Sequence, residues 1–351
     1  DKMYEVMGQI IEKYSGTDDQ LILNLSSGTP QIISALFALN RINDYNTQAI
    51  QVASPNKSAN RKYVPLSSED EQKLFDENKD NQKDYENRTI KDEAEKFSHS
   101  LLKRHLRSLL ASYDYQAAEK IINQKQYHAL LPKKDLSRLR NLLNDFVKVF
   151  KNQGLLSEIQ HYPLSDVEKK ALNYFLMIEV LKERGQVADV LIKSKSFVEF
   201  ILEEKIKEEH PDLIKFEGSL PKLNEEYEDF ENLLLYLDSE FKQMRDLKEV
   251  EEIIYPYQST LNLLSYTNIL SYYQASPDLL KSLSVITNLN GERNKVAHGL
   301  SEIDSRLISR KKMNEVIAAL RNILQDSFAI DNRYFNYYQE KNEEMLTLLR
   351  K

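Results

Sequence analysis

Hydrophobic positions in the first 56 residues follow two different periods. Apolar side chains three or four positions apart predict a helix over 3–14: Met3, Val6, Met7, Ile10, Ile11 and Tyr14. Short apolar runs at 21–25 and 49–53 have the length of buried strands, and the segment 31–39 between them has helical spacing. The order helix, strand, helix, strand predicts a parallel α/β sheet. Because two strands do not make a stable doubly wound domain, we expect earlier strands to precede residue 1.

From about Tyr63 onward the pattern predicts helices to the end of the chain. The predicted helices are 89–111, 115–124, 135–151, 171–181, 187–204, 223–247, 260–274, 305–325 and 333–349. Ser68 with Glu71, and Ser165 with Glu168, have capping-box spacing. Gly154 marks a break, and Gly185 is placed to end a helix. Residues 69–91 are highly charged and are expected to be in part a poorly ordered connector.

Composition narrows the class of protein. Only 8 glycines and 9 prolines occur in 351 residues, which favours long helices. The absence of cysteine excludes disulfides, thiolate metal sites and cysteine nucleophiles, and suits the cytoplasm. No apolar run is long enough to span a bilayer, so we expect no membrane partner. The net charge of −7 means that any nucleic acid must bind at a local basic site.

The stretch NGERNKVAHGL, residues 290–300, combines groups suited to RNA cleavage without a metal. His298 can take or give a proton near neutral pH, and Arg293 can stabilise the negative charge on a phosphorane. Asn294 can orient the phosphate or the imidazole. Residues five apart on a straight helix point about 140° away from each other. The pair therefore converges either across a helix end, which Gly291 permits, or across a two-fold dimer axis. The pattern taken alone also fits an ordinary helix end.

The stretch LNLSSGTPQI, residues 23–32, places a turn between a predicted strand and a predicted helix. Thr29 is placed to cap the helix, with Pro30 in its first turn. Free amides at that helix end and the hydroxyls of Ser26 and Ser27 favour phosphate, and Gly28 allows close approach. The turn matches neither the dinucleotide fingerprint nor the P-loop, and taken alone it fits a plain strand–helix connection better than a ligand site.

The helical C-terminal block with R-N-x-x-A-H resembles the HEPN ribonucleases over about 163–351. The strand with its serine- and glycine-rich turn and T-P-Q resembles the ligand loop of CARF domains. Their combination resembles the type III CRISPR ancillary ribonucleases of the Csm-six type. This resemblance implies a partial Rossmann-like CARF domain at 1–88, a helical connector at 89–162 and an all-helical HEPN domain at 163–351. It implies Arg293 and His298 as catalytic residues and Asn294 as supporting.

The resemblance also implies the ligand and the mode of action. Ser26, Ser27, Gly28, Thr29 and Gln31 would bind a cyclic oligoadenylate, with the hexa-adenylate favoured and the tetra-adenylate possible. The expected protein is a homodimeric, cytoplasmic, metal-independent endoribonuclease without a cofactor. It would cut single-stranded RNA to 2′,3′-cyclic phosphate products in antiviral defence.

Three alternatives stay open. The chain could be a HEPN toxin controlled by a protein partner, or a non-catalytic helical binding or scaffold protein. The sensor domain could also degrade its own ligand. Histidines outside the motif have no partners at metal-ligand spacing, and the basic helix face around His105 is interpreted as solvated. The tyrosines at 334, 337 and 338 are interpreted as core or dimer contacts.

Overall fold

The computed structural model comprises two compact units, residues 1–105 and residues 106–351, each described here by itself. It describes the whole chain except residues 1, 15–20, 43–44, 46, 53–66, 78–82, 84, 86, 92–94, 125–129, 153, 247–251, 290, 292–293, 295–308 and 351. Among the helices of this described part, none combines the length and apolar character needed to cross a membrane.

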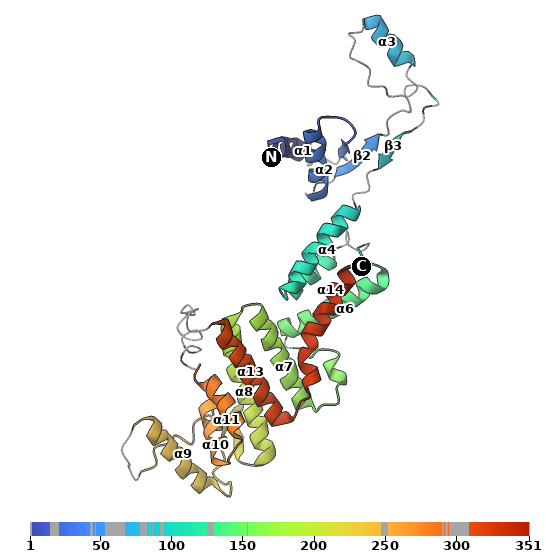
Figure 1. The fold of residues 1–351 in the computed structure, drawn as a ribbon. Helices are drawn as coiled ribbons and strands as arrows, with labels where there is room; N and C mark the ends of the chain where they lie inside the picture. Colours follow the sequence, from blue (N-terminus) through green and yellow to red (C-terminus); the bar gives the residue numbers. More distant parts are fainter. Residues whose placement is uncertain are drawn as a thin grey trace. The chain divides into compact units, whose positions relative to one another are not determined.

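The first unit is a small three-stranded sheet with helices (Figure 1). Its elements are α1 (Lys2–Tyr14), β1 (Leu21–Asn24), α2 (Pro30–Ile42), β2 (Thr47–Val52), α3 (Ser68–Glu77), β3 (Thr89–Lys91) and most of α4 (Glu95–Ala111). The sheet order is β1-β2-β3, with β1 parallel and β3 antiparallel to β2. Ile11, Leu23 and Leu39 form its buried centre, because α1 and α2 both turn their apolar faces to it.

The predicted helices at 3–14 and 31–39 and the predicted strands at 21–25 and 49–53 are confirmed, and the structure differs from the sequence prediction at two places. The predicted helix 89–111 begins at Glu95, because residues 89–91 pair with the edge of β2, with Ile50 opposite Lys91. All three side chains of β3 are exposed, so they offer no alternating burial pattern that would have indicated a strand. The predicted capping box is shifted by one residue: the Asp70 N–H donates to the Ser67 hydroxyl at 3.2 Å, and the Ser67 N–H donates to the Asp70 carboxylate at 3.2 Å.

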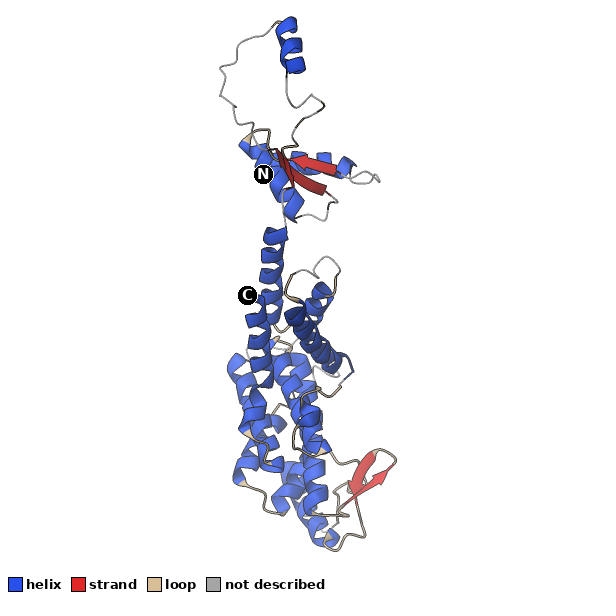
Figure 2. Ribbon diagram, turned by 90° about the vertical axis from the view of Figure 1, so that its right-hand side faces the viewer, coloured by secondary structure: helices blue, strands red, loops and turns tan. Residues whose placement is uncertain are grey.

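The second unit is almost entirely helical (Figure 2). Its elements are the end of α4, α5 (Tyr115–Ile122), α6 (Lys133–Asn152), η3 (Ile159–His161), α7 (Asp166–Glu183), α8 (Val187–Glu209), β4 (Ile214–Glu217), β5 (Leu220–Leu223), α9 (Phe230–Met244), α10 (Leu263–Tyr272), α11 (Pro277–Thr287), α13 (Arg310–Phe328), η4 (Asn332–Asn336) and α14 (Tyr337–Arg350). Helices α7, α8 and α13 pack against one another, and α11 packs on α13. Phe175, Val198 and Leu320 are fully buried between them.

Helix ends in this unit follow the predicted chemistry. Ser165 and Glu168 form a complete capping box at the start of α7. Gly185 ends α7 with a φ of +71°, a left-handed conformation that glycine adopts without strain. Helix α6 ends at Asn152, two residues before the predicted break at Gly154.

The prediction of helices alone from Tyr63 to the end is wrong at residues 214–223. That segment forms the β4–β5 hairpin, drawn red in Figure 2, and the predicted helix 223–247 begins only at Phe230. Glu217 pairs with Leu220 across a two-residue turn, and Gly218 has a φ of +67° there. Gly-Ser at a two-residue turn is a hairpin signal that the helical pattern on both sides obscured.

Candidate functional site

The candidate ligand loop, residues 25–29, lies at the carboxyl end of β1. Strand β1 runs parallel to β2, with Leu23 opposite Ala49, and the Leu25 N–H donates to the Ile50 carbonyl at 2.8 Å. The loop then leads into the first turn of α2. Ligands of parallel α/β sheets bind outside the carboxyl ends of strands, so the structure puts this loop where a ligand is expected.

Gly28 and Thr29 shape the entry into α2. Gly28 has a φ of +117°, and a Cβ built there would lie 3.4 Å from the Ile32 side chain. The Thr29 hydroxyl accepts from the Ile32 N–H at 3.4 Å, and the Thr29 carbonyl accepts from Ile33 at 3.0 Å. The N-cap and first-turn proline predicted from the sequence are therefore present. The first turn of α2 contains no acidic residue, so its positive end is open to an anion.

The two serines of the loop have different roles. The Ser26 N–H donates to the Asn24 side-chain oxygen at 2.9 Å, and the Ser26 hydroxyl accepts from the Val52 N–H. Ser26 therefore fastens the loop to β2. Ser27 is exposed and forms no hydrogen bond with another described residue, so its hydroxyl faces solvent and is available to a ligand.

Gln31 lines a hollow of about 420 Å³ between α1 and α2. The lining residues are Met3, Tyr4, Pro30, Gln31, Ser34 and Ala35. Sequence reasoning missed Tyr4 and Ser34. The spacing of Ser34 and Ala35, three and four positions after Gln31, places them on the same helix face and was the available signal. Together the loop and the hollow offer amides, hydroxyls, an amide side chain and a tyrosine, which suit phosphates and bases.

The predicted catalytic pair, Arg293 and His298, lies outside the described residues, which exclude 292–293 and 295–308. Asn294 is described: it is helical and exposed. Gly291 is also helical and exposed, and a Cβ built on it would meet nothing within 4 Å. The convergence of the pair therefore stays a prediction, while the position of Asn294 at a surface is compatible with a supporting role.

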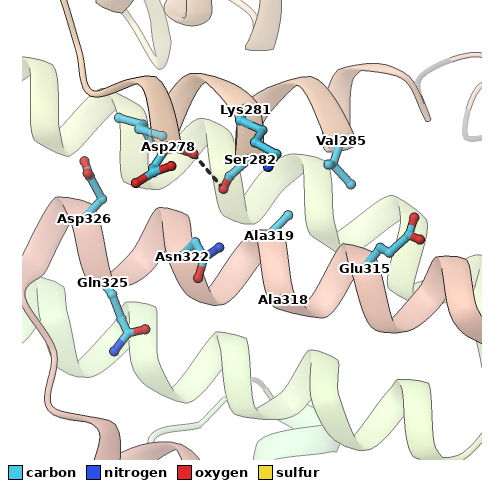
Figure 3. A pocket seen from close by; sticks show the side chains of 11 residues that line it. Asp278, Lys281, Ser282, Val285, Glu315, Ala318, Ala319, Asn322, Gln325 and Asp326 are labelled. Carbon is cyan, nitrogen blue, oxygen red and sulfur yellow. Dashed lines mark hydrogen bonds between the residues drawn. The ribbon is translucent and has the colours of Figure 1, made fainter.

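The motif is connected to two helices that pack together. Helix α11 precedes it, capped by the Ser276 hydroxyl with proline in the first turn, and α13 follows it, capped by Ser309. A groove of about 670 Å³ runs between these helices (Figure 3). Its polar lining residues are Asp278, Lys281 and Ser282 from α11 and Glu315, Asn322, Gln325 and Asp326 from α13. Sequence reasoning named none of these.

Contacts at one end of the groove fix the two helices to each other. The Ser276 hydroxyl donates to Asp326 at 2.8 Å, and Lys205 of α8 approaches the same carboxylate at 3.7 Å. Within α11, the Ser282 hydroxyl donates to the Asp278 carbonyl at 2.9 Å, the dashed contact in Figure 3. Both helices that border the motif are therefore connected to each other and to α8 by side-chain contacts.

Cations mark the start of α13, which begins ten positions after Leu300, the last residue of the motif stretch. The first turn contains no acidic residue, and Arg310 and Lys311 are exposed. Lys312 approaches Glu315 at 3.3 Å. Positive side chains at the positive end of a helix are mildly unfavourable in the free protein. They form a local cluster of positive charge on a chain whose net charge is −7.

Other candidate residues take structural positions. Within the described ranges, no group of three or more histidine or acidic side chains could hold a metal ion. His105 is exposed, and the His210 ring stacks on Tyr273 at 3.7 Å. The tail tyrosines Tyr334, Tyr337 and Tyr338 are at most 8% exposed, so they belong to the core of this unit.

Comparison with known proteins assigns both halves of the chain. Residues 2–89 match the family model of the Cas_Csm6 CARF domain, and residues 149–346 match that of the Cas_Csm6 HEPN domain. The chain is similar to the CRISPR system endoribonuclease Csm6 of Streptococcus thermophilus, with 58% identity over 99% of this chain and 82% of that protein. It is also similar to Csm6′ of the same organism, with 32% identity over 99% of this chain and 79% of that protein.

The fold agrees with a solved relative. The structure of Enterococcus italicus Csm6 bound to cyclic hexa-2′-fluoro-hexa-dAMP matches with a TM-score of 0.74 and 24% identity, covering 98% of this chain and 78% of that one. The predicted fold class, a partial Rossmann-like CARF domain followed by helices and a helical HEPN domain, is confirmed, except that the β4–β5 hairpin interrupts the helices of the HEPN domain. On these matches, the chain belongs to the Csm6 family of CRISPR-system endoribonucleases.

Proposed function

We propose that the chain is a cyclic-oligoadenylate-activated, metal-independent endoribonuclease that cuts single-stranded RNA and leaves 2′,3′-cyclic phosphate ends. The observation that carries the proposal is the presence of two sites in one chain. An exposed loop with phosphate-binding chemistry lies at a strand end in the CARF region, and RNKVAHG lies between capped helices in the HEPN region.

The proposed reaction needs one proton transfer on each side of the phosphate. His298 takes the proton from the ribose 2′-hydroxyl, or gives one to the departing 5′ oxygen, and Arg293 stabilises the phosphorane. A new O2′–P bond forms while the P–O5′ bond breaks, which gives the cyclic phosphate. Asn294 supports the phosphate or the motif helix from its exposed position. These groups supply the acid–base and charge-stabilising roles without a metal.

The proposed activator is a cyclic oligoadenylate, with the hexa-adenylate favoured over the tetra-adenylate. Ser27, Gly28 and Thr29 offer donors for its phosphates, and Gln31 borders a hollow that suits a base. The relative from E. italicus was solved with a cyclic hexa-dAMP analogue, which supports the larger ring. A symmetric ring suits a homodimer with the ring across the axis.

We place the sensor at 1–88, the connector at 89–162 and the ribonuclease domain at 163–351. In this scheme the ring stabilises one arrangement of the connector, which aligns the two motifs of the dimer. Local cations at Arg310 and Lys311 hold the RNA strand near the motif.

The test is cleavage of a quenched fluorescent RNA in EDTA, without activator and with cyclic tri-, tetra-, penta- and hexa-adenylate. We expect strong stimulation by one ring and loss of at least about 10³-fold in Arg293→Ala or His298→Ala. The matched control is His105→Ala, because that histidine is exposed and lies outside the motif. No stimulation by any ring from a folded dimer, or unchanged cleavage by His298→Ala, would refute the proposal and favour the toxin or the scaffold.

A further inference from the structure

A buried asparagine near the end of the chain holds the last turn of α4. Asn342 of α14 is 6% exposed, and its Nδ2 donates to the Leu110 carbonyl oxygen at 2.9 Å. The two residues are 232 positions apart in the sequence. This single bond therefore fastens the C-terminal helix of the second unit to the end of a helix that starts in the first.

Helix α4 is the element that the two units share. Its residues up to His105 group with the first unit, and those from Leu106 onward group with the second. Near its start, the Phe97 ring meets Phe37 of α2 edge to face, with ring centroids 5.7 Å apart. Because α2 begins directly after the candidate ligand loop, a shift of α2 on ligand binding reaches α4 through this aromatic pair.

The end of α4 adopts a strained conformation. The Tyr113 N–H donates to the Leu110 carbonyl at 3.0 Å, and the Asp114 N–H donates to the Leu109 carbonyl at 2.8 Å. This pattern is a Schellman motif, in which the left-handed residue is usually glycine. Here it is Tyr113, with a φ of +58°. A bulky residue keeps this conformation only while its surroundings hold it, so the bond from Asn342 acts on a turn that can change.

Hydrogen bonding at this contact is incomplete. Tyr115 and Tyr338 have buried hydroxyls, and Asn342 has a buried side-chain oxygen, and none of these atoms has a partner among the described residues. Tyr338 lies one turn before Asn342 on α14, so both side chains share a face. The Tyr338 and Tyr115 rings stack with centroids 6.0 Å apart. Unpaired buried polar groups are costly, so an arrangement that pairs these atoms would recover part of that cost.

A second buried asparagine provides the contrast. Asn173 of α7 is also 6% exposed. Its Nδ2 donates to the Gly154 carbonyl at 3.1 Å, and its side-chain oxygen accepts from the Leu156 N–H at 3.1 Å. Asn173 uses both ends of its amide to fix a loop, whereas the oxygen of Asn342 has no described partner.

Helix α14 is tied in turn to the helix that borders the motif. Arg321 and Gln325 of α13 each donate to the side-chain oxygen of Asn332 at 2.9 Å, in the turn that leads into α14. Helix α13 is the next described helix in the sequence after the motif segment. A displacement of α14 is therefore passed to α13 by named contacts.

We propose that Asn342, Tyr338 and Tyr115 form a two-state joint through which the first unit controls the ribonuclease site. In the observed state Asn342 holds the strained end of α4. In the other state the hydroxyls pair, the last turn of α4 rearranges, and α14 moves with it. This inference rests on the proposed activation by a cyclic oligoadenylate.

The test is Asn342→Leu in the full-length dimer, a change of similar shape that removes the bond to Leu110. We measure RNA cleavage with and without a saturating activating ring, ring affinity by calorimetry, and hydrogen exchange of the amides of residues 112–114. We define the activation ratio as the rate of RNA cleavage with the ring divided by the rate without it. The expected result is an activation ratio at least tenfold lower than in the wild type, and faster hydrogen exchange at residues 112–114. Cleavage without activator should stay the same, and ring affinity should stay within about threefold.

Asn173→Leu is the matched control, because it removes an equally buried asparagine from the same unit. It should lower thermal stability at least as much and leave the activation ratio unchanged. Tyr338→Phe is the second variant, in case Asn342→Leu folds poorly. It removes only one unpaired hydroxyl, so the folded protein should be no less stable, yet the activation ratio should fall.

The outcomes separate the joint from the proposed function. If a ring activates the wild type, and activates both Asn342→Leu and Tyr338→Phe as strongly as the wild type, the proposed joint is refuted. The proposed function is not affected by that result. Equal loss of activation in Asn173→Leu would also refute it, since the effect would then be general destabilisation. A wild type that no ring activates would refute the proposed function, and the joint with it.

Discussion

The two units differ most in how much of their apolar surface they bury themselves. In the described part of the first unit the buried hydrophobic residues are Ile11, Leu23, Leu25, Ala35, Leu39, Ala49 and Leu102. The same unit leaves Val6, Ile10 and Ile22 at least 40% exposed. In the second unit, whole faces of α7, α8 and α13 are buried. The second unit is thus stabilised largely by its own core, whereas the described part of the first unit buries few apolar side chains.

The second unit remains folded although it contains a largely buried carboxyl group, that of Glu179. Burial raises the pKa of Glu179 on α7 from 4.5 to about 7, although Arg321 and Lys182 oppose the shift. The folded state therefore binds the proton more tightly than the unfolded state does. The contribution of this carboxyl to stability is therefore fully present below pH 4.5 and is lost as the pH rises through about 7, by roughly 3 kcal/mol.

The largest expected effect comes from Glu179→Gln. At pH 8 the melting temperature of the second unit should rise by several degrees, and the fall in stability between pH 5 and 7 should disappear. Differential scanning calorimetry at several pH values provides the measurement. Glu183→Gln is the control: that side chain is 40% exposed and pairs with Lys182 at 2.6 Å, so little change is expected. An unchanged pH profile in Glu179→Gln would contradict the assignment.

The next effect in size is stabilisation by the activator. At a free concentration 100 times its Kd, the ring should stabilise the sensor unit by about 2.7 kcal/mol. Thermal unfolding followed by tyrosine fluorescence should then show that the unfolding transition of the first unit, at the lower temperature, shifts to a higher temperature. His298→Ala should show the same shift, because it leaves the ligand loop untouched. A shift confined to the upper transition would overturn the view that the sensor unit is the weaker one.

A smaller effect is expected from adding one methyl group to the ligand loop. Gly28→Ala places a Cβ at a φ of +117° and 3.4 Å from Ile32, so the loop must distort. We expect ring affinity to fall about tenfold, or about 1.4 kcal/mol. Gly185→Ala is the matched control in the second unit, with a φ of +71° and open space around its Cβ. It should cost about 1 kcal/mol of stability and leave ring affinity unchanged; calorimetry separates the two results.

The smallest effect concerns RNA binding at the start of α13. Arg310→Ala with Lys311→Ala should raise KM a few fold and lower the salt dependence of kcat/KM, by up to about 0.7 in log–log slope for each lost phosphate contact. The turnover rate at saturating RNA should not change. Lys133→Ala with Lys134→Ala is the control, since both lysines are exposed in the first turn of α6 and remove the same charge. An equal effect of both pairs would mean that only net charge matters.

Structural features that depend on residues close together in the sequence could be predicted from the sequence. Strands β1 and β2, the Thr29 cap and the capping box at Ser165 were predicted because each depends on neighbours within four residues. Strand β3 was missed because its three side chains are all exposed and have no alternating burial, and the β4–β5 hairpin was missed because the helical patterns on both sides obscured its Gly-Ser turn.

The candidate site was predictable in part for the same reason. Thr29 and Gln31 follow from local chemistry, while Tyr4 reaches the same hollow only through the packing of α1 on α2. The contact of Asn342 with Leu110 joins residues 232 apart, and no periodicity encodes it. The convergence of Arg293 and His298 stays a prediction, since both lie outside the described residues.

Helix α4 also has a mechanical consequence. A helix of 17 residues is about 25 Å long, at about 1.5 Å per residue. If the end that carries Phe97 tilts by about 5°, simple lever geometry moves the other end by about 2 Å. That distance exceeds what a 2.9 Å hydrogen bond between Asn342 and Leu110 can tolerate. In the proposed joint, such a tilt of α4 would therefore break the bond between Asn342 and Leu110.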